Sequence, residues 1–271
     1  MLVDVVRRKP LEPVLKAYAP GLLRQLAADK AAPGLLRLWG ESINFDELAN
    51  GRIVDPAVLS FLAGRLGAPK PEGRIAHAGM EHTYGYLFSL LPTKFGYKRA
   101  RWVRPDVAEG LGLPSGSLGP SPSSGTLLAN VTCVAGAIAL GDDKPASALL
   151  DGVKPYCAPE LRGYAPPRRE RLTETVSLPG GRAVSLRTDF VPFSAERGGN
   201  THLLVYSVYD PAAGMARLVT AFPVNAAFVK AALDPAGLGE GRPVQTRYNA
   251  WVEGLTGKPA TGLRSASSQS R

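Results

Sequence analysis

Four segments in the second half of the chain alternate between apolar and polar residues, and they constrain the fold more than any other feature. The segments are Leu172–Leu178, Ala183–Val191, Thr201–Tyr209 and Ala216–Val224. Period-two alternation is typical of strands that bury one face. The first two segments flank Pro179-Gly180-Gly181 and the last two flank residues 210–214, and short Gly- and Pro-containing segments between strands favour hairpins. The sequence therefore predicts two antiparallel hairpins here.

The first 70 residues have a different pattern, with leucines at helical spacing interrupted by Pro and Gly. Asp55-Pro56 is typical of a helix start, and Gly67 of a helix end. Helices followed by strands predict an α+β fold in which an N-terminal helical portion packs on a largely antiparallel β-sheet. We expect one domain, made of a helical portion (1–70) and a mainly β body (71–257), followed by a disordered tail (258–271).

Further elements are expected outside these two regions. Aromatic content favours a strand over two helical turns at Tyr84–Leu91, and a second strand is expected at Phe95–Val103. Continuous apolar content predicts one buried strand at Thr126–Leu140, or two strands divided near Gly136. A short helix at Ala226–Leu233 and a last strand at Val244–Val252 complete the expected elements.

The overall charge is strongly basic. The chain of 271 residues has 32 Lys and Arg against 23 Asp and Glu, a net charge of +9. Such a balance favours an anionic partner, such as nucleic acid, a phosphate ester or an acidic membrane surface, although a compositional bias toward Arg produces the same excess. No apolar run is long enough for a transmembrane helix and the N-terminus lacks a signal sequence, so we expect a cytoplasmic protein with no membrane partner.

The two cysteines, Cys133 and Cys157, have no zinc-like spacing. They form either one disulfide or two separate reduced thiols, and the cytosol favours the thiols. We expect no metal and no cofactor, because the three histidines lack the spacing and the acidic neighbours of a metal site.

The segment His77–Arg104 is the best candidate for one wall of a functional site, because it combines histidines, aromatic residues and cations. An imidazole titrates near neutral pH, so His82 is a candidate acid or base, and His202 could face it from a distant strand. The catalytic candidates are His82, His202 and Tyr84. The substrate-binding candidates are Lys98, Arg99, Arg101, Tyr97 and Trp102, which combine anion binding with aromatic stacking.

Three hypotheses of function follow from these residues. The first is a cofactor-independent enzyme that acts on an anionic small-molecule substrate by His-based acid/base chemistry with a Lys/Arg anion clamp. The second is an RNA-binding or metal-independent RNA-cleaving protein. The third is a non-enzymatic binding or structural protein whose cations are solvated.

One local similarity supports the second hypothesis. The segment VYDPAAGMARLVTAFPV (Val208–Val224), 17 of the 271 residues, resembles the closing hairpin of metal-independent endoribonuclease toxins of the barnase and RelE type. The resemblance implies acid–base cleavage of RNA by His and Lys/Arg groups, with Thr220 near the site.

Overall fold

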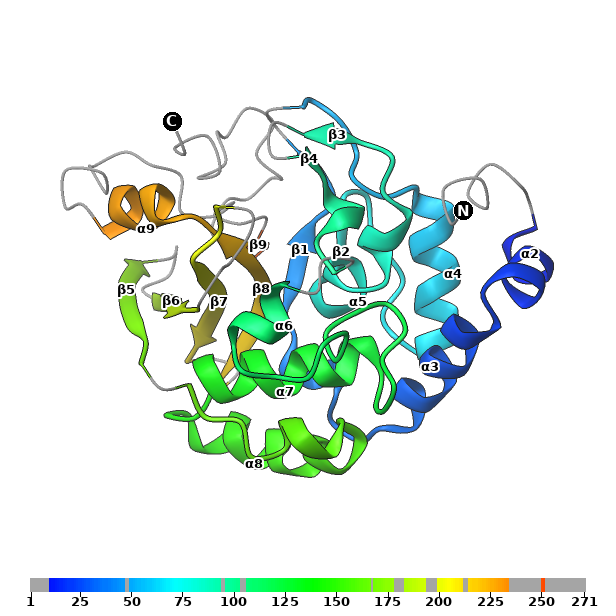
Figure 1. Cartoon of the computed structure of the whole chain (residues 1–271). Helices are drawn as coiled ribbons and strands as arrows, with labels where there is room; N and C mark the ends of the chain where they lie inside the picture. Colours follow the sequence, from blue (N-terminus) through cyan, green and yellow to red (C-terminus); the bar gives the residue numbers. More distant parts are fainter. Residues whose placement is uncertain are drawn as a thin grey trace.

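The structure is a computed structural model that describes residues 10–46, 49–93, 96–102, 106–166, 168–177, 183–193, 199–211, 214–233 and 250–251. It confirms the predicted α+β fold, with helices packed around antiparallel sheets (Figure 1). No helix in these described ranges is long and apolar enough to cross a membrane.

The N-terminal helices are α2 (Leu11–Tyr18), α3 (Pro20–Ala31) and α4 (Pro56–Leu66), with a 3-10 turn η1 (Leu36–Leu38) between α3 and α4. The predicted start of α4 is confirmed, since the Asp55 carboxylate accepts a hydrogen bond from the Ala57 backbone N–H at 2.7 Å. Gly67 ends α4 with a φ of 72°, a conformation that favours glycine.

A four-stranded meander forms the larger sheet, in the order β5-β6-β7-β8. Its strands are β5 (Glu170–Ser177), β6 (Ala183–Pro192), β7 (His202–Asp210) and β8 (Met215–Val224). Both predicted hairpins are therefore confirmed. The register of β7 and β8 shifts where Tyr206 pairs with Thr220 and Ser207 with Leu218, which leaves Val219 as the extra residue of a β-bulge.

A smaller sheet lies beside β8 and has the order β2-β1-β9. Its strands are β1 (Glu41–Ile43), β2 (Ile75–His77) and β9 (Ala250–Trp251). The chain just before β1 joins the two sheets, because Trp39 bridges Leu218 and the Gly40 N–H donates to the Leu218 carbonyl at 2.8 Å. The Ala78 N–H donates in turn to the Gly40 carbonyl at 2.9 Å. Helix α5 (Ala78–His82) therefore begins at the junction of the sheets (Figure 1).

Gly79 allows α5 to pack this closely. A Cβ atom at this position would lie 2.6 Å from the Trp39 ring, well inside van der Waals contact. The indole Nε1 of Trp39 donates to the Thr132 hydroxyl at 2.8 Å, which fixes the ring against which Gly79 rests. The close packing of α5 against Trp39 thus depends on the absence of a side chain at Gly79.

The strand expected at Thr126–Leu140 is wrong, since this segment forms helix α7 (Leu127–Ala139). Every residue of α7 except Ala137 is buried, so the helix has no polar face from which its period could be recognised. Its start is marked by Thr126, whose hydroxyl accepts from the Ala129 N–H at 3.0 Å. Figure 1 shows α7 beneath the larger sheet, with α8 (Lys144–Val153) below it.

The strand expected at Tyr84–Leu91 is also wrong, because this segment contains a 3-10 turn, η2 (Gly85–Phe88), whose four residues are all buried. The strand expected at Phe95–Val103 is reduced to β4 (Gly96–Tyr97), which pairs with β3 (Pro92–Thr93) and leads into a 3-10 turn, η3 (Lys98–Ala100). The remaining elements are α6 (Asp106–Gly110), η4 (Lys154–Tyr156), η5 (Pro159–Leu161) and the confirmed helix α9 (Ala226–Leu233). Of the strand expected at Val244–Val252, β9 is the described part, and the tail at 258–271 lies outside the described residues.

Cys133 and Cys157 form a disulfide, which settles the alternative that the sequence left open and overturns the preference for two thiols. Both cysteines are buried, and the bond ties α7 to the segment after η4.

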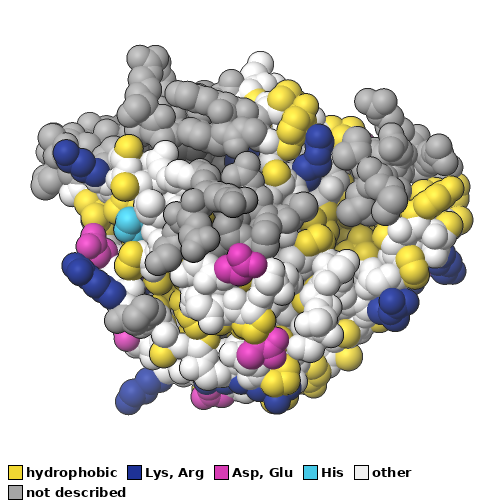
Figure 2. Space-filling model, in the orientation of Figure 1, with side chains coloured by type: hydrophobic (Ala, Val, Ile, Leu, Met, Phe, Trp, Pro, Cys, Tyr) yellow, Lys and Arg dark blue, Asp and Glu magenta, His cyan; other side chains and the backbone are white. Residues whose placement is uncertain are grey.

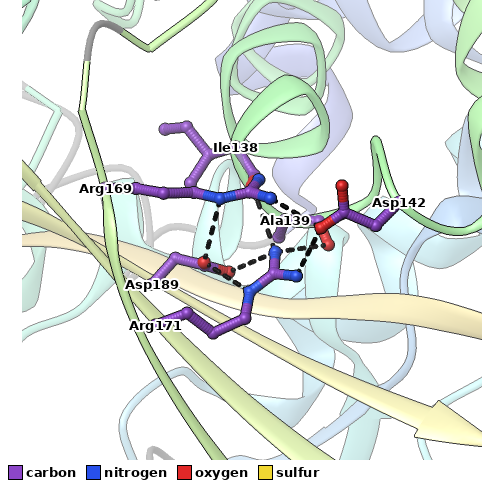
Figure 3. Close-up of polar contacts among 6 residues, drawn as sticks. All are labelled: Ile138, Ala139, Asp142, Arg169, Arg171 and Asp189. Atoms are coloured by element: carbon purple, nitrogen blue, oxygen red, sulfur yellow. Dashed lines mark hydrogen bonds and ion pairs between the residues drawn. The ribbon is translucent and has the colours of Figure 1, made fainter.

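An ion-pair network fastens the C-terminal end of α7 to the larger sheet (Figure 3). Arg171 from β5 donates to the buried Asp189 of β6 at 2.7 Å and to Asp142 at 2.6 Å. Arg171 and its neighbour Arg169 also donate to the backbone carbonyls at the end of α7, including that of Ile138. Cations at this position satisfy carbonyls that the helix leaves without partners. The network therefore serves the fold.

Candidate functional site

Buried and half-buried polar and charged side chains gather where α5 meets the two sheets. We call this group the junction cluster. It consists of Ser42, Asp46, Glu81, His82, Tyr86, Lys98, Arg101 and Thr220. These residues come from β1 and the segment after it, from α5, η2 and η3, and from β8 beside its bulge. Bulges re-aim side chains and are over-represented next to active sites.

Glu81 is the most deeply buried acidic group of the cluster, with 0% of its surface exposed. The Ser42 hydroxyl donates to its Oε2 at 2.5 Å, whereas its Oε1 has no hydrogen-bond partner among the described residues. Burial raises the pKa of Glu81 to about 7, because desolvation outweighs the opposing effects of Ser42, Lys98 and Arg101. Glu81 therefore exchanges a proton near neutral pH.

His82, the next residue, is 1% exposed, and neither ring nitrogen makes a hydrogen bond of ordinary geometry within the described parts of the chain, although the Val219 backbone lies near enough to the ring to favour its charged form. Its ring packs against Tyr86, with the ring centroids 4.8 Å apart. Burial, together with the nearby cations Arg101 and Lys98, holds the pKa of His82 well below its usual range, and the backbone of Val219 opposes this shift only in part. The imidazole is therefore neutral at physiological pH.

Arg101 lies over two aromatic rings. Its guanidinium carbon is 4.7 Å from the centroid of Tyr86 and 4.8 Å from that of Phe222, and its Nη1 donates to the Thr220 hydroxyl at 3.3 Å. No ion pair joins it to a carboxylate in the described ranges. Burial lowers the pKa of Arg101, while the neighbouring Tyr86 and Glu81 oppose that shift. The cluster thus holds a cation with aromatic neighbours and no described counterion.

Lys98 is the second cation of the cluster. Its Nζ lies 3.5 Å from the Asp46 carboxylate and 6.0 Å from the Tyr86 ring centroid, and 18% of its side chain is exposed. The expected strand would place Lys98 and Arg101 on opposite faces. The turn η3 instead brings both side chains to Tyr86, because residues three apart lie on the same side of a helical turn.

The other candidates predicted from the sequence lie elsewhere or have different contacts. Tyr84 donates to Asp29 at 2.5 Å in a separate buried network with Thr126, so it does not contact His82. His202 pairs in the sheet with Val224, four residues along β8 from Thr220, a distance of roughly 13 Å along the strand. The structure therefore does not bring His202 and Tyr84 to His82.

Two candidates lie near the cluster without joining it. Arg99 stacks on the exposed ring of Tyr97, with its guanidinium carbon 3.8 Å from the centroid, and donates to the Ser89 carbonyl at 3.1 Å. Trp102 is buried, and its Nε1 donates to the backbone carbonyl of His82 at 2.7 Å. Trp102 therefore holds the His82 backbone in place rather than presenting a stacking surface.

Sequence reasoning missed Glu81 and Ser42. Glu81 could have been recognised from the sequence, because its carboxylate directly precedes His82, a candidate acid or base. No sequence feature pointed to Ser42, since it reaches Glu81 only through the pairing of β1 with β2. Thr220 entered only through the resemblance to RNA-cleaving toxins, and its described contact is with Arg101.

Comparison with known proteins identifies no relative, since no family model, no curated protein and no solved structure matches the chain. Within the described ranges, no group of three or more His, Cys, Asp and Glu residues is arranged to hold a metal ion.

Proposed function

We propose that this protein is an enzyme that transfers protons on a small anionic substrate at the junction cluster. In this proposal Glu81 is the general acid, His82 is the general base, and Arg101 and Lys98 bind the anionic group. One observation carries the proposal. Two adjacent, fully buried titratable side chains keep three polar atoms that make no hydrogen bond of ordinary geometry to described residues, beside two cations.

The energetic cost of this arrangement supports a functional role. Leaving a buried polar atom unsatisfied costs about 1–3 kcal/mol. Proteins satisfy most such atoms, and each exception calls for an explanation such as a catalytic role or a bound water or ion. Perturbed pKa values next to each other are also typical of acid/base sites. Glu81 and His82 combine both features, while the buried Asp29 receives hydrogen bonds at both of its oxygens.

The charges of the cluster support these two roles. An acid whose pKa lies near 7 is well matched to proton transfer at neutral pH. His82 is neutral and so has a free electron pair that can accept a proton. The cations Arg101 and Lys98 weaken it as a base, and a bound anion would offset them. Substrate binding would therefore raise the basicity of His82 at the moment when it is needed.

A titration of the three histidines by NMR tests this proposal. We expect His82 to stay neutral in the free protein to well below pH 6.5, and its signals to move when benzoate or phenyl phosphate is added. His82→Gln identifies its signals. His202→Gln is the matched control, because His202 is remote from the cluster and its signals are expected to ignore the anions. His82 signals that stay unchanged with every anion would remove the proposal.

The other two hypotheses remain predictions with their own tests. RNA binding through several phosphates would make affinity fall steeply with salt concentration, so a flat salt response argues against it. Figure 2 shows the Lys and Arg side chains spaced around the outline of the face in view, not gathered into one patch. A purely structural protein predicts that no anion changes the His82 signals.

A further inference from the structure

Building on the proposed function, we infer that the anion bound at the junction cluster is a monoanionic carboxylate and that it enters together with one proton. The inference rests on the number of charges in the cluster, the approach that Arg101 leaves open, and the unpartnered oxygen of Glu81.

The two cations of the cluster differ in whether a carboxylate neutralises them. Asp46 neutralises Lys98, with 3.5 Å between the charged atoms. Arg101 is then the one cation of the cluster without an ion pair to a described carboxylate. With Glu81 protonated, the described cluster has one net positive charge, which a monoanion balances. A phosphate dianion would leave an excess negative charge in a site where unpaired charge is costly.

The surroundings of Arg101 favour the same class of ligand. The rings of Tyr86 and Phe222 face the guanidinium, so an anion meets it at its edge. Thr220 accepts from Nη1, Tyr86 is a second hydrogen-bond partner of the guanidinium, and the other N–H groups lie in the guanidinium plane. A planar carboxylate accepts two parallel hydrogen bonds from such an edge. Lys98 and Arg101 are half-buried whereas Glu81 and His82 are fully buried, so we expect the anion to approach from the side of the cations.

The proton is held by Glu81. The groups that face this carboxyl are Ser42 from β1, Lys98 from η3 and Arg101, while its helix neighbour His82 is neutral. Once Glu81 ionises, the charges of Glu81, Asp46, Lys98 and Arg101 sum to zero, and an incoming anion gains no net attraction. Protonated Glu81 removes that competition, and its unpartnered Oε1 is available as a hydrogen-bonding group toward the ligand.

Isothermal titration calorimetry with benzoate and phenyl phosphate tests the inference. Benzoate stays a monoanion between about pH 6 and 9, whereas phenyl phosphate is largely a dianion above about pH 6. We expect the benzoate Kd to rise about tenfold per pH unit above pH 7, because the ionised form of Glu81 competes with binding. At pH 8, titrations in buffers of different ionisation enthalpy should show uptake approaching one proton per benzoate.

Three variants assign these effects to residues. Glu81→Gln keeps a neutral group and should bind benzoate with no dependence on pH. Arg101→Gln should weaken benzoate binding on the order of 100-fold. Arg101→Lys keeps the positive charge but cannot donate two parallel hydrogen bonds, and should weaken binding by at least about tenfold. The matched control is Arg74→Gln, which removes an exposed arginine that also lies over an aromatic ring, that of Phe45, and should leave the Kd unchanged.

The outcomes separate this inference from the proposed function. Phenyl phosphate binding more tightly than benzoate, with affinity that rises with pH, overturns the inference and leaves the anion site in place. Benzoate binding without proton uptake does the same. If neither anion binds and the His82 signals do not respond, the proposed function fails together with the inference.

Discussion

Replacing Glu81 by Gln should make the protein more stable at alkaline pH, and the size of the effect follows from the burial of this side chain. The carboxyl is 0% exposed and its pKa rises from 4.5 to about 7 on folding. Between these values the unfolded chain has lost the proton that the folded state keeps, so stability falls as pH rises, by about 1.4 kcal/mol per unit. Over this interval the loss amounts to about 3 kcal/mol.

The amide does not titrate and resembles the protonated acid, so the two proteins should be equally stable near pH 4. Near pH 8 the variant should be more stable by about 3 kcal/mol. Urea unfolding followed by circular dichroism at several pH values measures this difference, in which the titrations of all other groups cancel.

A difference that does not change with pH would refute the reasoning, and so would a wild-type protein that gains stability on ionisation of Glu81. The second result would mean that Lys98 and Arg101 outweigh desolvation. Glu12→Gln is a control of opposite sign, because hydrogen bonds from Arg65 and Lys16 lower the pKa of this exposed carboxylate. In that case the wild-type protein should lose stability relative to the variant as the pH falls through the folded pKa.

Two further changes test the buried polar networks that lie outside the junction cluster. Tyr84→Phe removes a hydroxyl that donates to the buried carboxylate of Asp29, and should lower the free energy of unfolding by about 1–3 kcal/mol in urea. Arg171→Met removes the closest partner of Asp189, which is 0% exposed, and should cost about 3–5 kcal/mol. Adding Asp189→Asn to that variant should recover part of the loss, and no recovery would contradict the role assigned to the ion pair.

A secondary-structure element could be predicted from the sequence when one of its sides is exposed to solvent. The strands β5 to β8 and helix α4 have clear signals, namely alternation, turn residues and an Asp-Pro start, and the structure confirms all of them. Helix α7 is enclosed by protein on nearly every side, so its apolar sequence fitted a buried strand equally well. The prediction of a strand at the turn η2 was wrong for the same reason, because all four residues of η2 are buried.

For the candidate site, too, the sequence identified local features but not the contacts between distant segments. His82, Lys98 and Arg101 were identified as candidate site residues by their side-chain chemistry, because imidazole, ammonium and guanidinium groups occur together in one short segment. Whether they meet depended on the local backbone, and η3 brings Lys98 and Arg101 to one side where a strand would separate them. The long-range partner Ser42 lies about 40 positions from Glu81 and had no sequence signal.

The sequence by itself determined the fold class, the two hairpins and the segment that contains the titratable groups, because these depend on local periodicity and residue chemistry. The tertiary structure decided which of those groups are buried together. Desolvation at the junction of two sheets raises the pKa of Glu81 and lowers that of His82, and it depends on packing between distant segments, which no local pattern encodes.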